Sequence, residues 1–213
     1  MSTNRRRFLE TAAANAAALA IMPAAAFGAT HRDSSSSITL ESPEWDLNWT
    51  DRVKGKHRAV FDCTEPESGS GPWRAKVWTT QNIEVLKASP SDVTPIIVLR
   101  HNAIILAMQQ TFWDKYGIGA KKKITDPMTE KPTDRNPAAA SLSSQISSGA
   151  IVLACALALD ECVGLIADTE KLSHSDAEKR ALAYLIPGII LQPSGVFAVI
   201  RAQEAGALYV IAS

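Results

Sequence analysis

Five short apolar runs constrain the fold of this chain more than any other feature, because none shows a sustained alternation with polar residues. They lie at 57–63, 95–99, 150–154, 189–191 and 207–212. Such runs are typical of strands covered on both faces, as in a parallel sheet. Helical segments separate the runs, so we predict an α/β fold: a three-layer α/β/α domain with a five-stranded, mainly parallel sheet and right-handed crossovers.

The segments between the first runs carry helix signals. Pro72 stands where a first helical residue is expected and predicts a helix that extends to about Lys87. Apolar residues at i, i+4 and i+8 predict one amphipathic helix after the second run. These residues are Ile104, Ile105, Met108 and Phe112.

The last third of the chain carries two further helix starts. Ser175 with Glu178 has the pattern of a capping box. Ser194 is expected to cap the last helix, which ends at Gly206. The residues of this helix that are expected to face the core are Val196, Val199 and Ile200.

The N-terminus has the order of an export signal: a basic stretch, an apolar stretch, then small residues. Residues 5–9, Arg-Arg-Arg-Phe-Leu, resemble the twin-arginine consensus, and the alanine-rich stretch at 11–27 is too short and too mildly apolar for a membrane span. We therefore predict a signal peptide over 1–28 that the twin-arginine export machinery recognises. The mature form is expected in the periplasm or otherwise outside the cytoplasm, without a membrane segment.

Composition limits the function of the remaining chain. The first 28 residues hold three of the 22 basic residues and one of the 22 acidic residues, so the rest is slightly acidic. No basic surface for nucleic acid or an anionic membrane is indicated. Three irregularly spaced cysteines are too few for a disulfide scaffold or a zinc pattern, although an oxidising compartment allows one bridge.

The chain after the leader divides into a tether and one domain. Residues 29–54 are polar, with a serine run, and read as a tether. Residues 55–213 form the domain, in which 117–137 interrupts the alternation with basic residues, prolines and no apolar period. A long irregular segment inside a domain is more often functional or a subunit contact than idle. The alternative is a solvated surface excursion.

Candidate site residues follow the predicted strands, because ligands of open parallel sheets gather beyond the carboxyl ends of the strands. Cys63 ends the first strand and Cys155 ends the third. His101 follows the second strand, and Ser194-Gly195 follow the fourth. If the first three strands are neighbours, both thiols and the imidazole share one rim. A protonated imidazole or a helix N-terminus nearby lowers the pKa of a thiol and makes it a nucleophile.

Each of these residues has a structural alternative. Cys155 can be an inert thiol in an apolar strand, and Cys63 a packing residue or half of a bridge. His101 can bond a backbone carbonyl, and Ser194 can be only an N-cap. The residues lack the short-range spacing of a metal site, and no nucleotide loop or acid–base motif appears, so neither a metal nor a cofactor is predicted.

Four segments carry a family resemblance: 98–101, 149–159, 185–188 and 192–210, of which the Pro-Ser-Gly-Val-to-Tyr stretch in the last is the most specific. On these segments the chain resembles the DsrE/DsrF-like family over about 56–213, and the insertion after Tyr116 lies outside the common pattern. The resemblance implies a five-stranded α/β/α domain that forms homo-oligomers, either trimers or hexamers. Some members carry persulfide on a cysteine at the end of the third strand, a position that Cys155 matches.

Two functions remain. The first is an exported DsrE-like accessory protein that binds a small ligand or a partner, with Cys63, Ser194 and Gly195 as ligand contacts. The alternative is a sulfur-relay protein in which Cys155 accepts sulfane sulfur from a small sulfur-containing ligand. In that case His101 favours the thiolate and the 117–137 loop shields the persulfide. Export into oxidising conditions separates this chain from cytosolic relay members, so the first function is preferred.

Overall fold

The computed structural model describes residues 45–213. The predicted signal peptide and most of the predicted tether lie outside the described residues. The last residues of that tether differ from the expectation, because Asn48–Arg52 form a 3₁₀ helix, η1, whose Trp49 is buried in the domain core. The folded domain therefore includes residues that the polar composition assigned to the tether.

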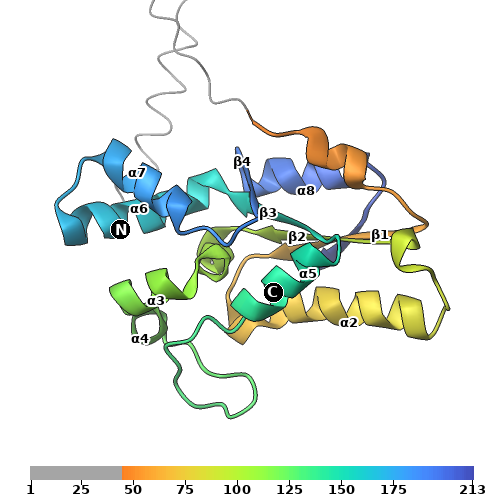
Figure 1. Ribbon diagram of the computed structural model, residues 1–213, viewed down its shortest axis with the longest axis horizontal. Coiled ribbons are helices and arrows are strands. Elements are labelled where there is room, and N and C mark those ends of the chain that lie inside the picture. Colours follow the sequence, from red (N-terminus) through yellow and green to blue (C-terminus); the bar gives the residue numbers. More distant parts are fainter. Residues whose placement is uncertain (1–44) are drawn as a thin grey trace, which may run out of the picture. The chain divides into compact units, whose positions relative to one another are not determined.

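A five-stranded sheet with every strand parallel forms the centre of the domain, in the order β4-β3-β2-β1-β5 (Figure 1). The strands are β1 His57–Cys63, β2 Val93–Leu99, β3 Ile151–Cys155, β4 Ile190–Gln192 and β5 Leu208–Ile211. All five predicted strands are present, and the first three strands of the sequence, β1, β2 and β3, lie next to one another. The predicted three-layer α/β/α fold is confirmed.

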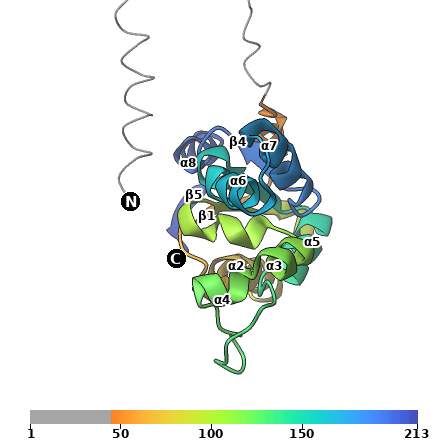
Figure 2. The same ribbon diagram turned by 90° about the vertical axis from the view of Figure 1, so that its left-hand side faces the viewer.

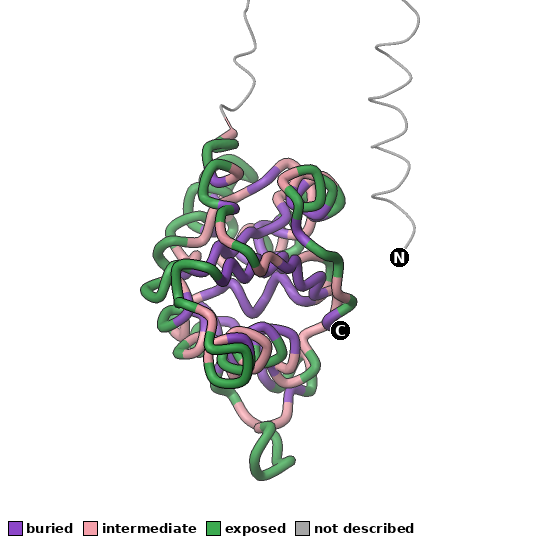
Figure 3. The backbone as a smooth tube through the Cα atoms, turned by 90° about the vertical axis from the view of Figure 1, so that its right-hand side faces the viewer, coloured by how far each residue is buried: buried purple, intermediate pink, exposed green. Residues whose placement is uncertain are grey.

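Helices cover both faces of the sheet (Figure 2). One face packs against α2, Ser70–Glu84, and we call it the α2 face; α5, Ala139–Ser147, lies beside α2. The opposite face packs against α8, Gly195–Glu204, and η1, and we call it the α8 face. The buried backbone between these layers is continuous through the sheet (Figure 3).

Side chains of each strand alternate between two separate cores, as the period of two requires. Phe61, Ile97 and Val152 belong to the core on the α2 face. Their sequence neighbours Val60 and Ile96 belong to the core on the α8 face. Parity along a strand therefore decides which core a side chain enters.

The remaining helices gather where β2 and β3 end. They are η4 His101–Ala107, α3 Gln110–Tyr116, α4 Ile118–Lys122, α6 Ala156–Glu170 and α7 His174–Ala183. Two short 3₁₀ turns lie elsewhere: η2, Glu67–Gly69, precedes α2, and η3, Pro90–Asp92, precedes β2. The η4 segment packs against α6, and α6 against α7. No helix among residues 45–213 is both long and apolar enough to cross a membrane.

Two helix predictions are corrected. The single helix predicted over 104–112 is a 3₁₀ segment followed by α3, because Met108 bridges to Leu185 and Gln109 is extended. The cap of α7 is Ser173, whose hydroxyl accepts from the Asp176 N–H, so the predicted capping box lies two residues too late.

The predicted inward face of the last helix is only partly correct. Ser194 caps α8 as predicted, and its Oγ accepts from the Phe197 N–H at 3.1 Å. Val199 is buried, but Val196 and Ile200 are exposed. The helix therefore has more apolar surface than the sheet beneath it covers.

The segment 117–137 is more ordered than its composition predicts. It begins with α4, and a β-bridge between Thr125 and Pro132 closes a projecting loop (Figure 1). The Asp126 carboxylate accepts from the N–H groups of Met128 and Thr129, and these hydrogen bonds lower the pKa of Asp126. An Asx-type turn thus fixes the tip of the loop.

The anchor of this loop is a close backbone approach at Gly119. A Cβ at this position would lie 2.1 Å from the carbonyl oxygen of Thr133. We predict that Gly119→Ala lowers the free energy of unfolding by about 2 kcal/mol, because backbone must move to admit the methyl group. Gly164→Ala in α6 is the control: nothing lies within 4 Å of its Cβ, so stability should rise by about 0.5 kcal/mol. Urea unfolding measures both, and equal effects would contradict the close approach.

Candidate functional site

The carboxyl ends of the central strands lie side by side, but the two predicted thiols do not meet there. Cys63 pairs with Leu99, which pairs with Ala154, and all three belong to the core on the α2 face. Cys155 is one residue later than Ala154 and so lies on the α8 side. The expectation that Cys63 and Cys155 crowd one rim with His101 is therefore corrected. Cys63 ends β1 on the α2 face, Cys155 ends β3 on the α8 face, and β2 lies between them.

Cys63 packs inside the core on the α2 face. Its side chain is fully buried, and the nearest point of α2 is Gly71, where a Cβ would lie 2.5 Å from the sulfur. Burial raises the pKa of the Cys63 thiol to about 12, and the neighbouring Asp62 carboxylate adds to this shift. No disulfide forms among the three cysteines. A thiol this enclosed has neither the charge nor the access for ligand chemistry.

His101 turns away from both thiols. Its backbone is in the left-handed region, with φ of 51°, and its side chain is 66 % exposed. The Nδ1 atom lies 3.3 Å from Oε1 of Glu65, and the Asn102 amide donates to Oε1 and Oε2 of the same carboxylate at 3.0 and 2.9 Å. The left-handed turn directs the imidazole toward the segment after β1. The predicted pairing of His101 with Cys155 is replaced by a pairing with Glu65.

Arg100, the residue before His101, is the cation on the α8 face. Its Nε and Nη2 donate to the two carboxylate oxygens of Asp62 at 2.6 and 2.8 Å. The Tyr209 hydroxyl donates to the same carboxylate at 2.8 Å. The hydrogen bond to Asp62 raises the pKa of Arg100, and the charge of Cys155 adds a smaller contribution in the same direction. Arg100 follows Leu99, which pairs with Ala154, so the strand register places Arg100 next to Cys155.

The start of α8 is shaped around this arginine. A Cβ on Gly195 would lie 2.4 Å from Cβ and Cδ of Arg100, so only glycine allows the side chain to cross the helix N-terminus. Ser194, one residue earlier, uses its hydroxyl for the helix cap. The predicted positions Ser194 and Gly195 therefore adjoin Arg100, with structural tasks in this structure.

Gln192 completes this group. It pairs with Cys155 in the sheet register and is fully buried. Its Nε2 donates to the backbone oxygens of Asp46 and Leu191, while its Oε1 has no partner. We call Asp62, Arg100, Cys155, Gln192 and Tyr209 the carboxyl-edge cluster. Sequence reasoning named only Cys155 of these five, although the Arg100 position directly after a strand was a usable signal.

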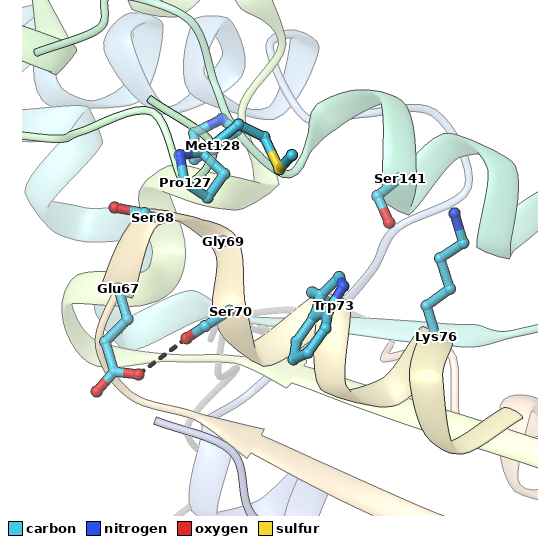
Figure 4. A pocket seen from close by; sticks show the side chains of 10 residues that line it. Glu67, Ser68, Gly69, Ser70, Trp73, Lys76, Pro127, Met128 and Ser141 are labelled. Atoms are coloured by element: carbon cyan, nitrogen blue, oxygen red, sulfur yellow. Dashed lines mark hydrogen bonds between the residues drawn. The ribbon is translucent and has the colours of Figure 1, made fainter. Parts of the chain in front are cut away.

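A second candidate region is a cavity of about 470 Å³ between α2 and the projecting loop (Figure 4). Its walls carry apolar groups from Trp73, Pro127, Met128 and Pro137, and polar groups from Glu67, Ser70, Lys76 and Ser141. Figure 4 shows Met128 on the loop side and Trp73 on the α2 side, with Lys76 at one end and Glu67 with Ser70 at the other. Trp73 is 60 % exposed and Met128 is 89 % exposed.

The rim of this cavity is a strained turn. Glu67, Ser68 and Gly69 have φ values of 33°, 55° and 83°, so two non-glycine residues adopt left-handed conformations in succession. The Ser68 hydroxyl lies 2.9 Å from the Thr125 hydroxyl, and Ser70 donates to Glu67 at 2.8 Å. Such strain persists where surrounding contacts enforce it, and it concentrates at functional sites. These contacts tie the start of α2 to the projecting loop.

In the part of the chain that the structure describes, no group of three or more His, Cys, Asp or Glu side chains is placed to hold a metal ion. No family model matches the chain, and no curated protein matches it. One solved structure similar to it is that of a protein of unknown function from Methanobacterium thermoautotrophicum, at 14 % identity and a TM-score of 0.41. The similarity covers 73 % of this chain and 98 % of that chain. Nothing about the site follows from a likeness at this level.

The burial of Cys63 leads to a prediction about alkaline pH. The folded state holds the pKa near 12, whereas the unfolded thiol ionises near 9, so only the unfolded state gains from ionisation between these values. This stabilising contribution is complete below pH 9 and is lost as pH rises toward 12. We expect wild type to lose about 1 kcal/mol more than Cys63→Ala between pH 8 and pH 10, measured by urea unfolding. Equal pH dependence in both proteins would show that Cys63 ionises freely.

Proposed function

We propose that this protein is an exported accessory protein that binds a small ligand in the cavity between α2 and the projecting loop. The observation that carries this proposal is the pair of large apolar side chains, Trp73 and Met128, left exposed on opposite walls of one cavity. Pockets that combine apolar walls with a few polar groups are the usual form of small-molecule sites. The twin-arginine-like leader at 1–28 supports a site of action outside the cytoplasm.

The polar groups of the cavity indicate the ligand class. Lys76 has no ion pair or hydrogen bond within residues 45–213, whereas Glu67 is already paired with Arg74 and Ser70. The free charge in the cavity is therefore positive. Tryptophan offers a flat apolar surface and methionine an adaptable one. These properties favour a small molecule with an aromatic or apolar body and an anionic group.

The dye 8-anilinonaphthalene-1-sulfonate has this chemistry and serves as a probe. We expect the native protein to bind it at one site with enhanced fluorescence, and Trp73→Ala and Met128→Ala each to weaken binding about tenfold, because each removes one apolar wall. Lys76→Gln should weaken it about threefold through the lost charge.

Leu157→Ala in α6 is the matched control for this titration, since Leu157 is a similarly exposed apolar residue on another element. Its dye affinity should equal that of wild type. Undiminished binding by Trp73→Ala, or equal losses in Trp73→Ala and Leu157→Ala, would contradict a site in this cavity.

A second candidate function, sulfur transfer on Cys155, is supported by the carboxyl-edge cluster. Cys155 ends β3 directly before the N-terminus of α6, with Arg100 beside it as a cation. The free N–H groups of a helix N-terminus and a guanidinium both stabilise negative charge. The unpaired Oε1 of Gln192 is available to accept from a thiol or persulfide S–H.

The transfer balances without an oxidant. The Cys155 thiolate attacks the outer sulfur of a donor persulfide R–S–SH, a bond forms between its Sγ and that sulfur, and the S–S bond of the donor breaks. The departing R–S⁻ takes up the proton that Cys155 lost. The oxidation level moves with the transferred sulfur. In this reaction Arg100 takes the part first expected of His101.

Intact-mass measurement after exposure to glutathione persulfide tests this second function. We expect a gain of one sulfur atom on native wild type, reversed by dithiothreitol and absent in Cys155→Ser, because Cys155 is the thiol beside the cation. Cys63→Ser should keep the gain, since Cys63 is enclosed on the opposite face. A gain that survives in Cys155→Ser would remove Cys155 from this role.

A further inference from the structure

Within residues 45–213, the β5 edge of the sheet is apolar and carries none of the usual protection. Its four residues, Leu208–Ile211, include no charge and no proline, and the side chains of Leu208 and Ile211 are 76 % and 74 % exposed. Exposed Val196 and Ile200 of α8 extend this apolar surface, and Tyr209 is also exposed. Natural proteins blunt free edges with charges, prolines, bulges or covering segments. We call these five exposed side chains the β5 surface.

The opposite edge of the sheet shows such protection. Strand β4 has only three residues, and the Gln192 side chain in it donates to the backbone oxygen of Asp46, which brings the segment before η1 against this edge. Short length and a covering segment both prevent pairing with another chain. The contrast indicates that the exposure of β5 is specific to one edge.

Shallow hollows flank β5 on both faces of the sheet. On the α2 face, Trp78, Leu208 and Val210 line a hollow of about 360 Å³. On the α8 face, Val196, Ile200 and Tyr209 line one of about 270 Å³. A strand added to an edge places alternate side chains on alternate faces, so two hollows are what an added strand would fill.

The backbone of β5 also fixes which groups are free for an added strand. The Ala212 N–H donates to the backbone carbonyl oxygen of Asp62 in β1. The backbone N–H and C=O groups of Leu208 and Val210, four and two residues earlier, therefore also point toward β1. By alternation, the N–H and C=O groups of Tyr209 and Ile211 point away from the sheet. These four groups make the edge self-complementary in an antiparallel arrangement.

We propose that β5 pairs with β5 of a second copy of this chain, antiparallel and centred on Val210. A two-fold axis normal to the sheet brings each face next to the same face of the partner. A residue of β5 can therefore pair only with a residue whose side chain lies on the same face. With Val210 on the axis, Tyr209 of each copy pairs with Ile211 of the other, which gives two such pairs. All four outward backbone groups then form hydrogen bonds, and an aromatic and a β-branched side chain meet on the α8 face.

Charge supports a second copy as the occupant. The amino end of β1 carries Lys56, His57 and Arg58, while Glu65 follows its carboxyl end. Glu65 is 45 % exposed. Antiparallel pairing turns the basic end of one copy toward the acidic end of the other, and the β5 surface between them has no charge to repel its own image. The same surface in parallel would oppose like charges.

Sedimentation velocity tests the dimer. Wild type should sediment as a dimer or a multiple of dimers, and Ile211→Lys should raise the dissociation constant at least about 100-fold, because it puts a charge into the paired edge. Val85→Lys is the matched control, since Val85 is 71 % exposed at the end of α2, and it should leave the assembly unchanged. A wild-type protein that stays monomeric at its highest soluble concentration overturns the proposal. This holds also if β5 is then found to bind a different protein.

Disulfide trapping tests the register without relying on the folding of Ile211→Lys. Val210→Cys places two cysteines at a non-hydrogen-bonded pair, about 4.5 Å apart at Cα, which is within disulfide range. Mild oxidation should link Val210→Cys into a covalent dimer and leave Leu208→Cys at the wild-type background, although Leu208 is the more exposed residue. A trimer in which Val210→Cys does not link, or linking at 208 in place of 210, overturns the pairing.

Discussion

Both faces of the central sheet are covered, so the alternation of side chains along each strand assigns every residue of the carboxyl edge to one of two environments. On the α2 face the helical layer is thick, and Cys63 is enclosed between Gly71 and the sheet. On the α8 face α8 and η1 form the cover, and at the strand ends the Arg100 side chain is partly exposed while the Asp62 carboxylate is enclosed. The different environments of Cys63 and Cys155, which are 0 % and 6 % exposed, follow from parity, not from residue type.

Asp62 shows how this edge tolerates a buried charge. Its carboxylate is almost fully enclosed, and two bonds from Arg100 with one from Tyr209 satisfy it. Such a pair adds little net stability, but removing one partner costs about 3 kcal/mol because the other charge stays buried. The network therefore links β1, β2 and β5 at their carboxyl ends. Since β5 has only four residues, this link also fixes the position of the exposed edge strand.

The fold was predictable because its signals are local and repeated. Continuous apolar runs predicted all five strands and their parallel arrangement, and Ser194 predicted the start of α8. The helix predicted over 104–112 failed because the same apolar spacing fits a buried 3₁₀ segment, and a tertiary bridge between Met108 and Leu185 decides between the two. The site was less predictable, since a one-residue difference at a strand end moves a side chain to the other face. Neither Trp73 nor Met128 carried any periodic signal that would have marked a cavity wall.

The inward face predicted for α8 is only partly correct, and the reason is physical and bears on assembly. Val196, Val199 and Ile200 form one apolar stripe, and periodicity alone predicts that all three enter the core. The sheet under α8 ends at β5, so Val199 is covered while Val196 and Ile200 extend beyond the last strand. A contiguous group of exposed apolar side chains lowers the solubility of a protein unless another surface covers it. A helix whose apolar stripe is wider than the sheet beneath it can cover the rest of the stripe by packing against a second chain. The unprotected strand β5 beside α8 is where that second chain would pair.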